Sequence, residues 1–448
     1  MKKEQISRRT FLANVSAGTV AVATGTLPLM ANSKDASGQL AMLGGQPVRK
    51  QAWPTWPVWE RDAEEGILSV LRSGKWWRGS GGKVKEFEEK YAELMGAKRC
   101  LATASGTTAL LISLHVLGID AGDEVLVSPY TFIATYNSVF ISKALPVFVD
   151  TDQETFTMNP DKIEERITER TKAILPVHIY GLPVDMDKVN AIARKHNLVV
   201  IEDACQAWLA EYGGKKCGTI GDLGCFSFQN SKHLPAGEGG AIVGNNDDIM
   251  DRCHAFHNCG RPYGNMPATR EYITRGSNRR MQQFQAVILM SQMKRIKKDA
   301  DIRVANAMYL NSRIKEIPGI IPSKLADGAT RAAYHLYPFR YKKSFFNDAP
   351  KEKFIQALRA EGVPCSSGYA QQNKHGLIEE ALTSRGYQRL FSKERLSQYR
   401  EENRLPDNDQ LCEEAVVFTQ NMLLGEKQDM DDIFNAIEKV YINRDKLV

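Results

Sequence analysis

The sequence predicts an α/β protein with a mostly parallel sheet, followed by a smaller α+β unit. Between residues 98 and 244, short β-branched runs alternate with segments of helical pattern, which is typical of a parallel sheet. Beyond about residue 330, the pattern changes to one strand followed by helices. A chain of 448 residues with 43% hydrophobic content is long enough for two or three domains of ~150 residues with a large core.

The first 31 residues resemble a signal peptide of the twin-arginine (Tat) export route. A basic start precedes Ser7-Arg8-Arg9-Thr10-Phe11-Leu12, and a weakly apolar stretch ends near Ala31. A membrane-spanning helix is the alternative, but Asn14, Ser16, two glycines and a proline make this stretch a poor one. We therefore expect cleavage near Ala31 and a periplasmic or extracellular chain with no stable membrane span.

Residues 32–46 are typical of a loose linker, and five of the six tryptophans follow it, between Trp53 and Trp77. A helical pattern at 60–71 stops at Gly74, as helices often do. These aromatic residues could line a substrate entrance. We favour the alternative, in which they pack an N-terminal arm against the rest of the chain.

We expect residues 47–290 to form a large domain with this arm, and residues 291–448 to form an interdomain helix and a small C-terminal domain. The strands expected in the large domain are residues 99–103, 124–128, 145–150, 173–178, 198–202, 224–228 and 240–244. The other expected elements are a long helix within 281–315, a strand at 334–341, and helices at 350–361 and 428–440.

Charge and cysteine spacing argue against two classes of site. The net charge of +6 is mild, and no basic stripe with interleaved aromatic residues indicates nucleic-acid binding. The eight cysteines lack CxxC spacing, so no metal site is predicted. We interpret them as buried apolar residues, although an exported protein could form disulfides.

Four motifs contain the candidate residues of an active site. The first, Ala104-Ser105-Gly106-Thr107-Thr108-Ala109-Leu110, follows a predicted strand and opens a helix. Backbone N–H groups at a helix start, together with small hydroxyl groups, can bind a phosphate dianion. Taken alone, such a segment is more often an ordinary N-cap.

The second motif ends a buried strand with Glu202-Asp203-Ala204-Cys205-Gln206. An acid at the C-terminal end of such a strand points into the crevice where α/β sheets bind ligands. Asp203 beside a pyridine nitrogen would keep that nitrogen protonated, and the ring could then accept the electron pair released at a substrate Cα. The alternative is a capping aspartate. Glu202 should face the opposite side of the sheet.

The third motif runs from Phe226 to Gly240 and contains Lys232 just past a strand, in a loop of small residues. A lysine so placed could form a Schiff base with a cofactor aldehyde and later move a proton. Ser227 could add a hydrogen bond to a phosphate. For an isolated lysine, a solvated loop residue is the alternative. The fourth motif, residues 275–281, has no role that can be deduced locally.

The order of the motifs along the chain resembles that of the DegT/DnrJ/EryC1/StrS family of aminotransferases, which depend on pyridoxal 5′-phosphate (PLP). The segments that carry this resemblance are, in order, SGTTAL, SPYTFIATYNSV, FVDTD, PVHIYG, IEDACQA, FSFQNSKHLPAGEGG, HNCGRP and GSNRRM. The resemblance covers roughly residues 44–440. It implies fold-type I, with a large α/β domain and a smaller C-terminal domain. It also implies a homodimer with its active sites at the subunit interface.

The resemblance implies a role for each matching residue around the cofactor ring. Lys232 would be the lysine that forms the Schiff base, and Asp203 would pair with the pyridine nitrogen. Gln206 would contact the ring hydroxyl, and Phe132 would stack on the ring.

The phosphate ligands implied by the same resemblance come from separate motifs. Gly106, Thr107 and Ser227 would hold the phosphate within one subunit. Asn278 would reach it from the partner subunit.

The implied reaction is transfer of an amino group from glutamate or glutamine to a ketosugar or ketocyclitol. The segments SGKWWR, FSFQNSK and HNCGRP are similar to those of aminocyclitol aminotransferases and 3-amino-5-hydroxybenzoate synthases. Dehydratase members of the family have histidine in place of the lysine, whereas this chain retains Lys232. Two alternatives remain open: a dehydratase or aromatising enzyme of the aminohydroxybenzoate synthase type, and a binding protein that keeps the fold without turnover.

The identity of the substrate is not fixed by the resemblance, because some residues depart from the family pattern. Trp208 and Leu209 replace the small or polar residue and the glycine that are usual in the family. His178, His233 and Arg261 are candidate groups on the substrate side, although a structural role is the more common one for each.

Overall fold

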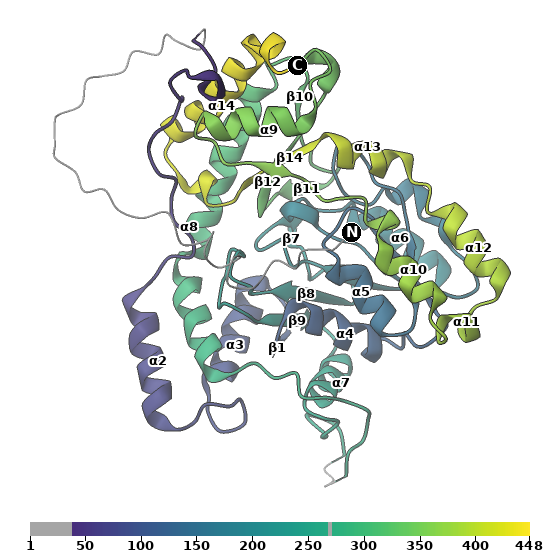
Figure 1. Ribbon diagram of the computed structural model, residues 1–448. Coiled ribbons are helices and arrows are strands. Elements are labelled where there is room, and N and C mark those ends of the chain that lie inside the picture. Colours follow the sequence, from purple (N-terminus) through teal and green to yellow (C-terminus); the bar gives the residue numbers. More distant parts are fainter. Residues whose placement is uncertain (1–37, 268–270) are drawn as a thin grey trace, which may run out of the picture. The chain divides into compact units, whose positions relative to one another are not determined.

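The computed structural model describes residues 38–267 and 271–448, so the predicted export signal at 1–31 lies outside the described residues. Its main feature is a seven-stranded sheet (Figure 1). In sheet order the strands are β1 (Arg99–Thr103), β9 (Gly240–Gly244), β8 (Leu223–Ser227), β5 (Val199–Asp203), β4 (Thr171–Leu175), β2 (Glu124–Val127) and β3 (Leu145–Phe148). Only β9 runs against its neighbours in this sheet, so the predicted α/β fold class is confirmed.

Helices cover this sheet, and most residues of its strands are buried. Every residue of β2 is buried, as is typical of a parallel strand covered on both faces. Helix α4 (Gly106–Val116) is itself almost entirely buried and contacts β1, β5, β8 and β9. Helix α6 (Met186–His196) packs on β4 and β5.

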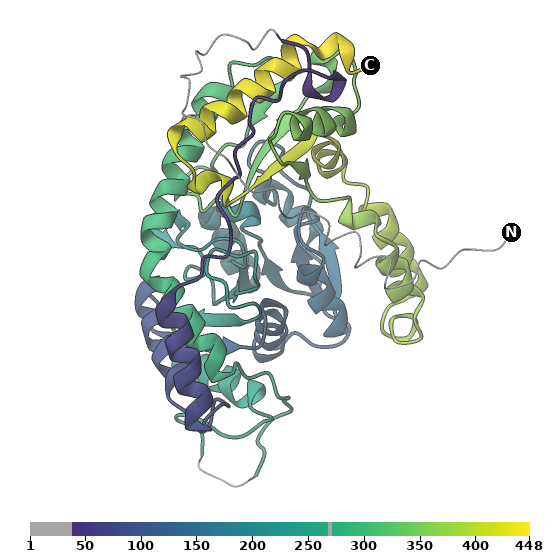
Figure 2. The same cartoon turned by 60° about the vertical axis from the view of Figure 1, so that its left-hand side comes forward.

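Helix α8 (Gln283–Ile314) is the long helix predicted within residues 281–315. It begins with a capping box formed by Gln282 and Gln285. It contacts α2 (Arg61–Ser73) and α3 (Lys83–Met95), and further along its length α14 (Lys427–Ile442) (Figure 2). No helix in the described part of the chain combines the length and the apolar character needed to cross a membrane.

The C-terminal part contains a second sheet of four strands. Their order is β10 (Ile320–Pro322), β12 (Leu336–Tyr341), β14 (Ala415–Thr419) and β13 (Ser366–Ser367). A third, small sheet pairs β11 (Ala329–Arg331) with β6 (Glu211–Tyr212), which in turn pairs with β7 (Lys215–Lys216). This small sheet joins segments from both sides of the predicted division at residue 290, and the division itself stays a prediction.

Helices complete the C-terminal part. Two of them, α9 (Lys351–Ala360) and α14, correspond to the helices predicted at 350–361 and 428–440. Four more helices were not predicted: α10 (Gly376–Thr383), α11 (Tyr387–Leu390), α12 (Lys393–Glu402) and α13 (Pro406–Glu414).

The N-terminal arm, residues 38–60, runs along the C-terminal part before it reaches α2. The Ala41 N–H donates to Glu361 at 2.8 Å. Arg49 forms ion pairs with Asp429 at 2.5 Å and Asp432 at 2.8 Å. The described part of the predicted linker, residues 38–46, contains the short 3₁₀ helix Ala41–Leu43. All eight cysteines are free, and five of them are buried.

Candidate active site

Three strands end side by side at one edge of the large sheet. Thr103 at the end of β1 and Ser227 at the end of β8 both pair with Gly240, where β9 begins. Asp203, the last residue of β5, pairs with Cys225 of β8. Residues from three of the predicted motifs therefore meet at this edge, which is where α/β sheets place their ligands.

Gly106 is the first residue of α4 and lies against the end of β8. A Cβ atom there would lie 2.8 Å from the Ser227 Cβ and 2.9 Å from the Cys205 Sγ, so the contact requires glycine. Ser105 caps the helix by accepting a hydrogen bond from the Thr108 N–H at 3.1 Å. The start of α4, with Thr107, is thereby held beside the Ser227 hydroxyl.

This corner suits an anion. The N–H groups of the first helical turn have no partners within the helix and carry a partial positive charge. Ser227 Oγ accepts a hydrogen bond from the Gln229 N–H at 3.4 Å, which leaves its own O–H available to donate. Both functions of the first motif, N-cap and anion cradle, can therefore coexist.

Asp203 is 5% exposed and accepts two hydrogen bonds. Thr135 Oγ1 donates to Oδ2 at 2.8 Å, and the Cys205 N–H donates to Oδ1 at 3.2 Å. A carboxylate can accept about four hydrogen bonds, so it can also accept one from a ring N–H. Phe132 lies one turn before Thr135, just ahead of α5 (Ala134–Ile141), and is 56% exposed.

Lys232 is half-buried, and its ammonium group lies among polar and aromatic side chains. Its Nζ is 3.3 Å from His335 Nε2 and 5.9 Å from the ring centroid of Trp208. Burial lowers the pKa of Lys232, against the opposing charge of Asp203. A lowered pKa raises the fraction of neutral amine, which is the form that attacks an aldehyde.

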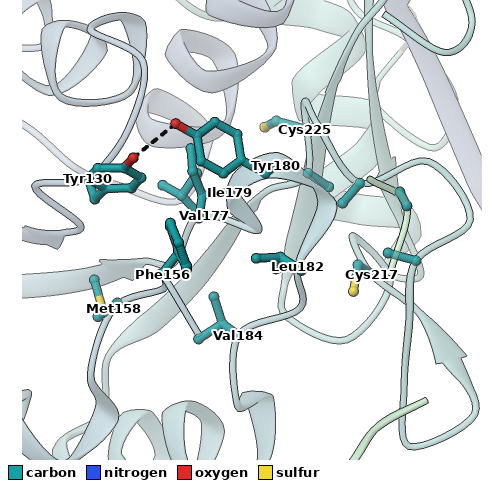
Figure 3. Close-up of a cluster of buried hydrophobic side chains, with 14 of the residues drawn as sticks. Tyr130, Phe156, Met158, Val177, Ile179, Tyr180, Leu182, Val184, Cys217 and Cys225 are labelled. Carbon is teal, nitrogen blue, oxygen red and sulfur yellow. Dashed lines mark hydrogen bonds between the residues drawn. The ribbon is translucent and has the colours of Figure 1, made fainter. Parts of the chain in front are cut away.

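Both the oxygen and the nitrogen of the Gln206 side-chain amide form hydrogen bonds. Its Oε1 accepts from the Tyr180 N–H at 2.8 Å, and its Nε2 donates to the Tyr369 hydroxyl at 2.9 Å. Tyr180 stacks on Tyr369 with ring centroids 5.5 Å apart. Tyr180 also shares a 3.1 Å hydrogen bond with Tyr130 (Figure 3). One N–H of the Gln206 amide remains for a ligand.

Glu202 faces away from this site, as predicted from strand alternation. It accepts hydrogen bonds from three backbone N–H groups, those of Gly218, Ile220 and Gly221. It also contacts His178 Nε2 at 2.9 Å. His178 Nδ1 accepts from the Val184 N–H at 3.1 Å, so His178 is a buried structural residue and not a substrate group.

The other two candidate substrate groups, His233 and Arg261, contact other side chains of this chain. His233 packs between Trp208 at 5.4 Å and His335 at 5.9 Å, and burial lowers its pKa well below the ordinary value. Arg261 is exposed, and its guanidinium lies 5.4 Å from the ring centroid of Tyr272.

Trp208 and Leu209 are the two residues that depart from the family pattern, and Trp208 lies beside the lysine. Trp208 is 1% exposed, and its ring forms part of the wall around the Lys232 amine. Leu209 has φ of 59°, a left-handed conformation that favours glycine. Leu209 therefore carries backbone strain that a glycine at this position would avoid.

Asn278 belongs to the fourth motif, whose backbone runs beside the start of the first motif. It is exposed, and its backbone forms a bridge with Asn258. The backbone carbonyl of the following residue, Arg279, accepts a hydrogen bond from the Ala104 N–H at 2.9 Å. The contact of Asn278 with a partner subunit's cofactor stays a prediction.

The motifs did not reveal several residues that shape the site. Thr135 supports Asp203, Tyr369 supports Gln206, and His335 contacts Lys232. Tyr369 and His335 belong to the C-terminal part, and no local pattern marked either of them.

Comparisons with known proteins agree with this geometry. The chain is 34% identical to the L-glutamine:2-deoxy-scyllo-inosose aminotransferase of Streptoalloteichus tenebrarius over 414 residues, which covers 90% of this chain and 97% of that protein. An aminotransferase structure from Psychrobacter cryohalolentis superposes with a TM-score of 0.77 and 31% identity, covering 88% of this chain and 99% of that one. The structure of 3-amino-5-hydroxybenzoic acid synthase superposes with a TM-score of 0.75 and 27% identity, covering 87% and 98%.

The model of one family matches most of the chain. Residues 59–419 match the DegT/DnrJ/EryC1/StrS aminotransferase family, whose members are PLP-dependent. Together with the sheet-edge lysine and carboxylate, this match establishes that the chain belongs to the DegT/DnrJ/EryC1/StrS aminotransferase family.

Proposed function

We propose that this aminotransferase binds PLP through Lys232 and transfers the amino group of L-glutamine or L-glutamate to the keto group of a cyclitol or sugar. The observation that carries the proposal is the meeting of Lys232, Asp203 and the start of α4 at one sheet edge. The glutamine donor and cyclitol acceptor follow from the aminocyclitol relative, which this chain matches over 97% of that protein's length.

The residues at this edge fit PLP. The cofactor supplies an electron sink for the charge released at the substrate Cα. Asp203, already an acceptor of two hydrogen bonds, would accept a third from the ring N–H. The free N–H of Gln206 would donate to the ring hydroxyl. Gly106, Thr107 and Ser227 would hold the phosphate.

Lys232 would also act as the proton carrier of the reaction. Its lowered pKa makes the free amine a base that can take the proton from the Cα of the amino donor. His335 Nε2, 3.3 Å away, would hold that amine near the reacting atoms.

Absorption spectroscopy tests this proposal. We expect the chain without residues 1–31 to gain a visible band when PLP is added, and the band to move towards the ultraviolet when glutamine or glutamate follows. Lys232→Ala should abolish the band. Failure of the native chain to bind PLP would refute the cofactor, and a band indifferent to all amino donors would refute amino transfer.

A PLP-dependent dehydratase or aromatising enzyme is the second candidate. Its support is the structural likeness to 3-amino-5-hydroxybenzoic acid synthase. Loss of water from the substrate, rather than gain of nitrogen in the product, would favour this candidate in mass spectrometry of the reaction.

We also propose a homodimer with shared active sites. An apolar groove of 530 Å³ lies beside the lysine loop, and its apolar lining includes Pro57, Val58, Ile67, Leu68, Pro235 and Ile288. Trp59 at this groove is 68% exposed, and exposed apolar patches often mark protein interfaces.

Subunit mixing tests the shared site. If Asn278 serves the partner's cofactor, Lys232→Ala and Asn278→Ala subunits should be inactive or weak alone, and their heterodimer should contain one complete site. Recovery of activity on mixing is the expected result. No recovery, with mixed dimers verified by mass spectrometry, would contradict it.

Export by the Tat route is proposed from residues 1–31 alone. We expect the full-length chain to reach the periplasm, and Arg8→Lys/Arg9→Lys to retain it in the cytoplasm. Equal distribution of both forms in cell fractionation would contradict this proposal.

A further inference from the structure

The carbonyl group of Lys232 is held by a residue of the N-terminal arm. Trp56 Nε1 donates a hydrogen bond to Lys232 O at 3.1 Å, across 176 residues of sequence. Within its own loop, the Lys232 N–H donates to Gln229 O at 2.9 Å. Both the N–H and the carbonyl of the lysine are thus bonded, one locally and one by the arm.

The indole of Trp56 lies over a buried cation. The Arg303 guanidinium carbon is 5.1 Å from the Trp56 ring centroid, and Arg295 is 5.9 Å from it. Arg303 is 0% exposed, and its Nε donates to Gln420 at 2.8 Å. Its Nη1 and Nη2 have no hydrogen-bond partner among the described residues.

Such a guanidinium is costly to bury without compensation, and burial lowers the pKa of Arg303 to about 9. The face of an aromatic ring attracts a cation, most strongly when that ring is tryptophan. The Asp299 carboxylate offsets part of this cost, and the Trp56 ring adds a cation–π contact to the guanidinium that holds the indole in place.

The arm is attached on both sides of Trp56. Before it, Asn421 Nδ2 donates to Pro54 O at 2.6 Å. After it, Gln292 Nε2 donates to Val58 O at 2.8 Å. Since Gln292 and Arg303 both belong to α8, this helix supports the arm at two points around the indole.

We propose that Trp56 is a positioning residue for Lys232. Its N–H holds the lysine carbonyl, and its ring is held by Arg303, so the arm and α8 together set where the Lys232 amine lies. This inference rests on the proposed function of Lys232. It assigns to the arm a part in the active site in addition to packing.

The chain offers a matched control in the same arm. Trp53 Nε1 donates to Gly362 O at 2.9 Å, and the Arg49 guanidinium lies 3.9 Å from its ring centroid. Trp53 thus has the same two contacts, an arginine on its face and a carbonyl at its N–H, but the carbonyl belongs to the C-terminal part and not to the lysine loop.

The test compares Trp56→Phe with Trp53→Phe in the full mature chain. Both variants keep an aromatic ring and lose one N–H donor, so we expect similar small decreases in melting temperature. Trp56→Phe alone should slow the attachment of PLP to Lys232 about fivefold, the effect of one hydrogen bond. Attachment is measured as Lys232 fixed by borohydride, using peptide mass spectrometry.

A second readout needs no cofactor. The rate at which an amine-reactive reagent labels Lys232 is followed against pH in the cofactor-free protein, and Trp56→Phe should shift this profile while Trp53→Phe should not. Equal PLP attachment and equal labelling profiles in the two variants would overturn the inference. If the native chain fails to bind PLP, the proposed function fails, whereas the labelling profile still decides the role of Trp56.

The pairing of Trp56 with Arg303 is tested by stability. Trp56→Leu leaves a buried guanidinium without its aromatic partner, so its melting temperature should fall more than that of Trp56→Phe. Adding Arg303→Met removes the buried charge and should restore part of the loss. A double variant less stable than Trp56→Leu would contradict the pairing.

Discussion

Glu202 and Asp203 are adjacent carboxylates on β5, yet their side chains lie on opposite faces of the sheet and have different surroundings. Glu202 is 0% exposed and is bound by three backbone N–H groups and His178. Asp203 accepts two hydrogen bonds at the sheet edge. The side of the strand decides the role of each carboxylate: Glu202 supports the fold, whereas Asp203 can still accept a hydrogen bond from a ligand.

The same contrast applies to the residues that support the site. Lys232, Asp203 and Ser227 come from strand ends and their loops. Trp56, His335 and Tyr369 reach them from the arm and the C-terminal part. Strand ends therefore supply the candidate functional groups, and distant segments supply contacts that hold the site.

Exchange of each carboxylate for an amide should give the largest difference between the two positions. Asp203→Asn keeps an acceptor but loses the negative charge that would hold a ring N–H. We expect a decrease in the rate of amino transfer of roughly 10²–10³-fold, typical of removing one electrostatic contact to a transition state. The rate is measured in single turnover with PLP bound.

Glu202→Gln is the matched variant. Its new NH₂ group would face backbone N–H donors, so the free energy of unfolding should fall by about 1–3 kcal/mol. The rate per folded molecule should remain close to that of the native chain. A catalytic loss as large as that of Asp203→Asn, without loss of stability, would contradict the division between the two sides.

The buried histidines near the site and elsewhere in the large sheet's surroundings should make stability depend on pH. Burial lowers the pKa of His233 and His335 well below the ordinary value, and lowers the pKa of His257 to about 3. These groups stay neutral in the folded chain but bind protons near pH ~6.5 when it unfolds, so stability falls as pH falls below that value. Each contributes a slope of roughly 1.4 kcal/mol per pH unit.

Urea unfolding between about pH 5 and 6.5 measures this slope. His335→Gln should reduce it by one histidine's contribution, and so should His233→Asn. His196 is the control, because it is partly exposed and hydrogen-bonded to Glu164 at 2.7 Å. An unchanged slope in both buried variants would show that these histidines are already protonated in the folded chain.

Much of the sheet and its edge follows from local pattern. The strands at residues 99–103 and 240–244 were predicted with their observed bounds, and the alternation of Glu202 and Asp203 was also correct. Helices α10 to α13 are short, and their pattern is weaker; in α12, for example, only Leu396 and Tyr399 are buried. A short polar helix resembles a loop until tertiary contacts are known.

The supporting contacts could not be predicted for a different reason. His335, Tyr369 and Trp56 lie 103, 163 and 176 residues from their partners in the site. Periodicity and motif spacing report on neighbours within one element. They do not report which residue of a distant segment will lie against a given strand end.

Tyr369→Phe is the mildest of these tests and concerns one such distant contact. The change removes the hydroxyl that accepts from Gln206 at 2.9 Å, while the ring can still stack on Tyr180. Because the Gln206 carbonyl remains bound to the Tyr180 N–H, the amide should loosen without leaving the site. We expect PLP affinity to fall by about fivefold, the effect of one neutral hydrogen bond, as measured by equilibrium titration of the visible band. PLP affinity should fall further in Gln206→Ala, and adding Tyr369→Phe to that variant should not lower the affinity again. An additive loss would show that Tyr369 acts on the cofactor by a route other than Gln206.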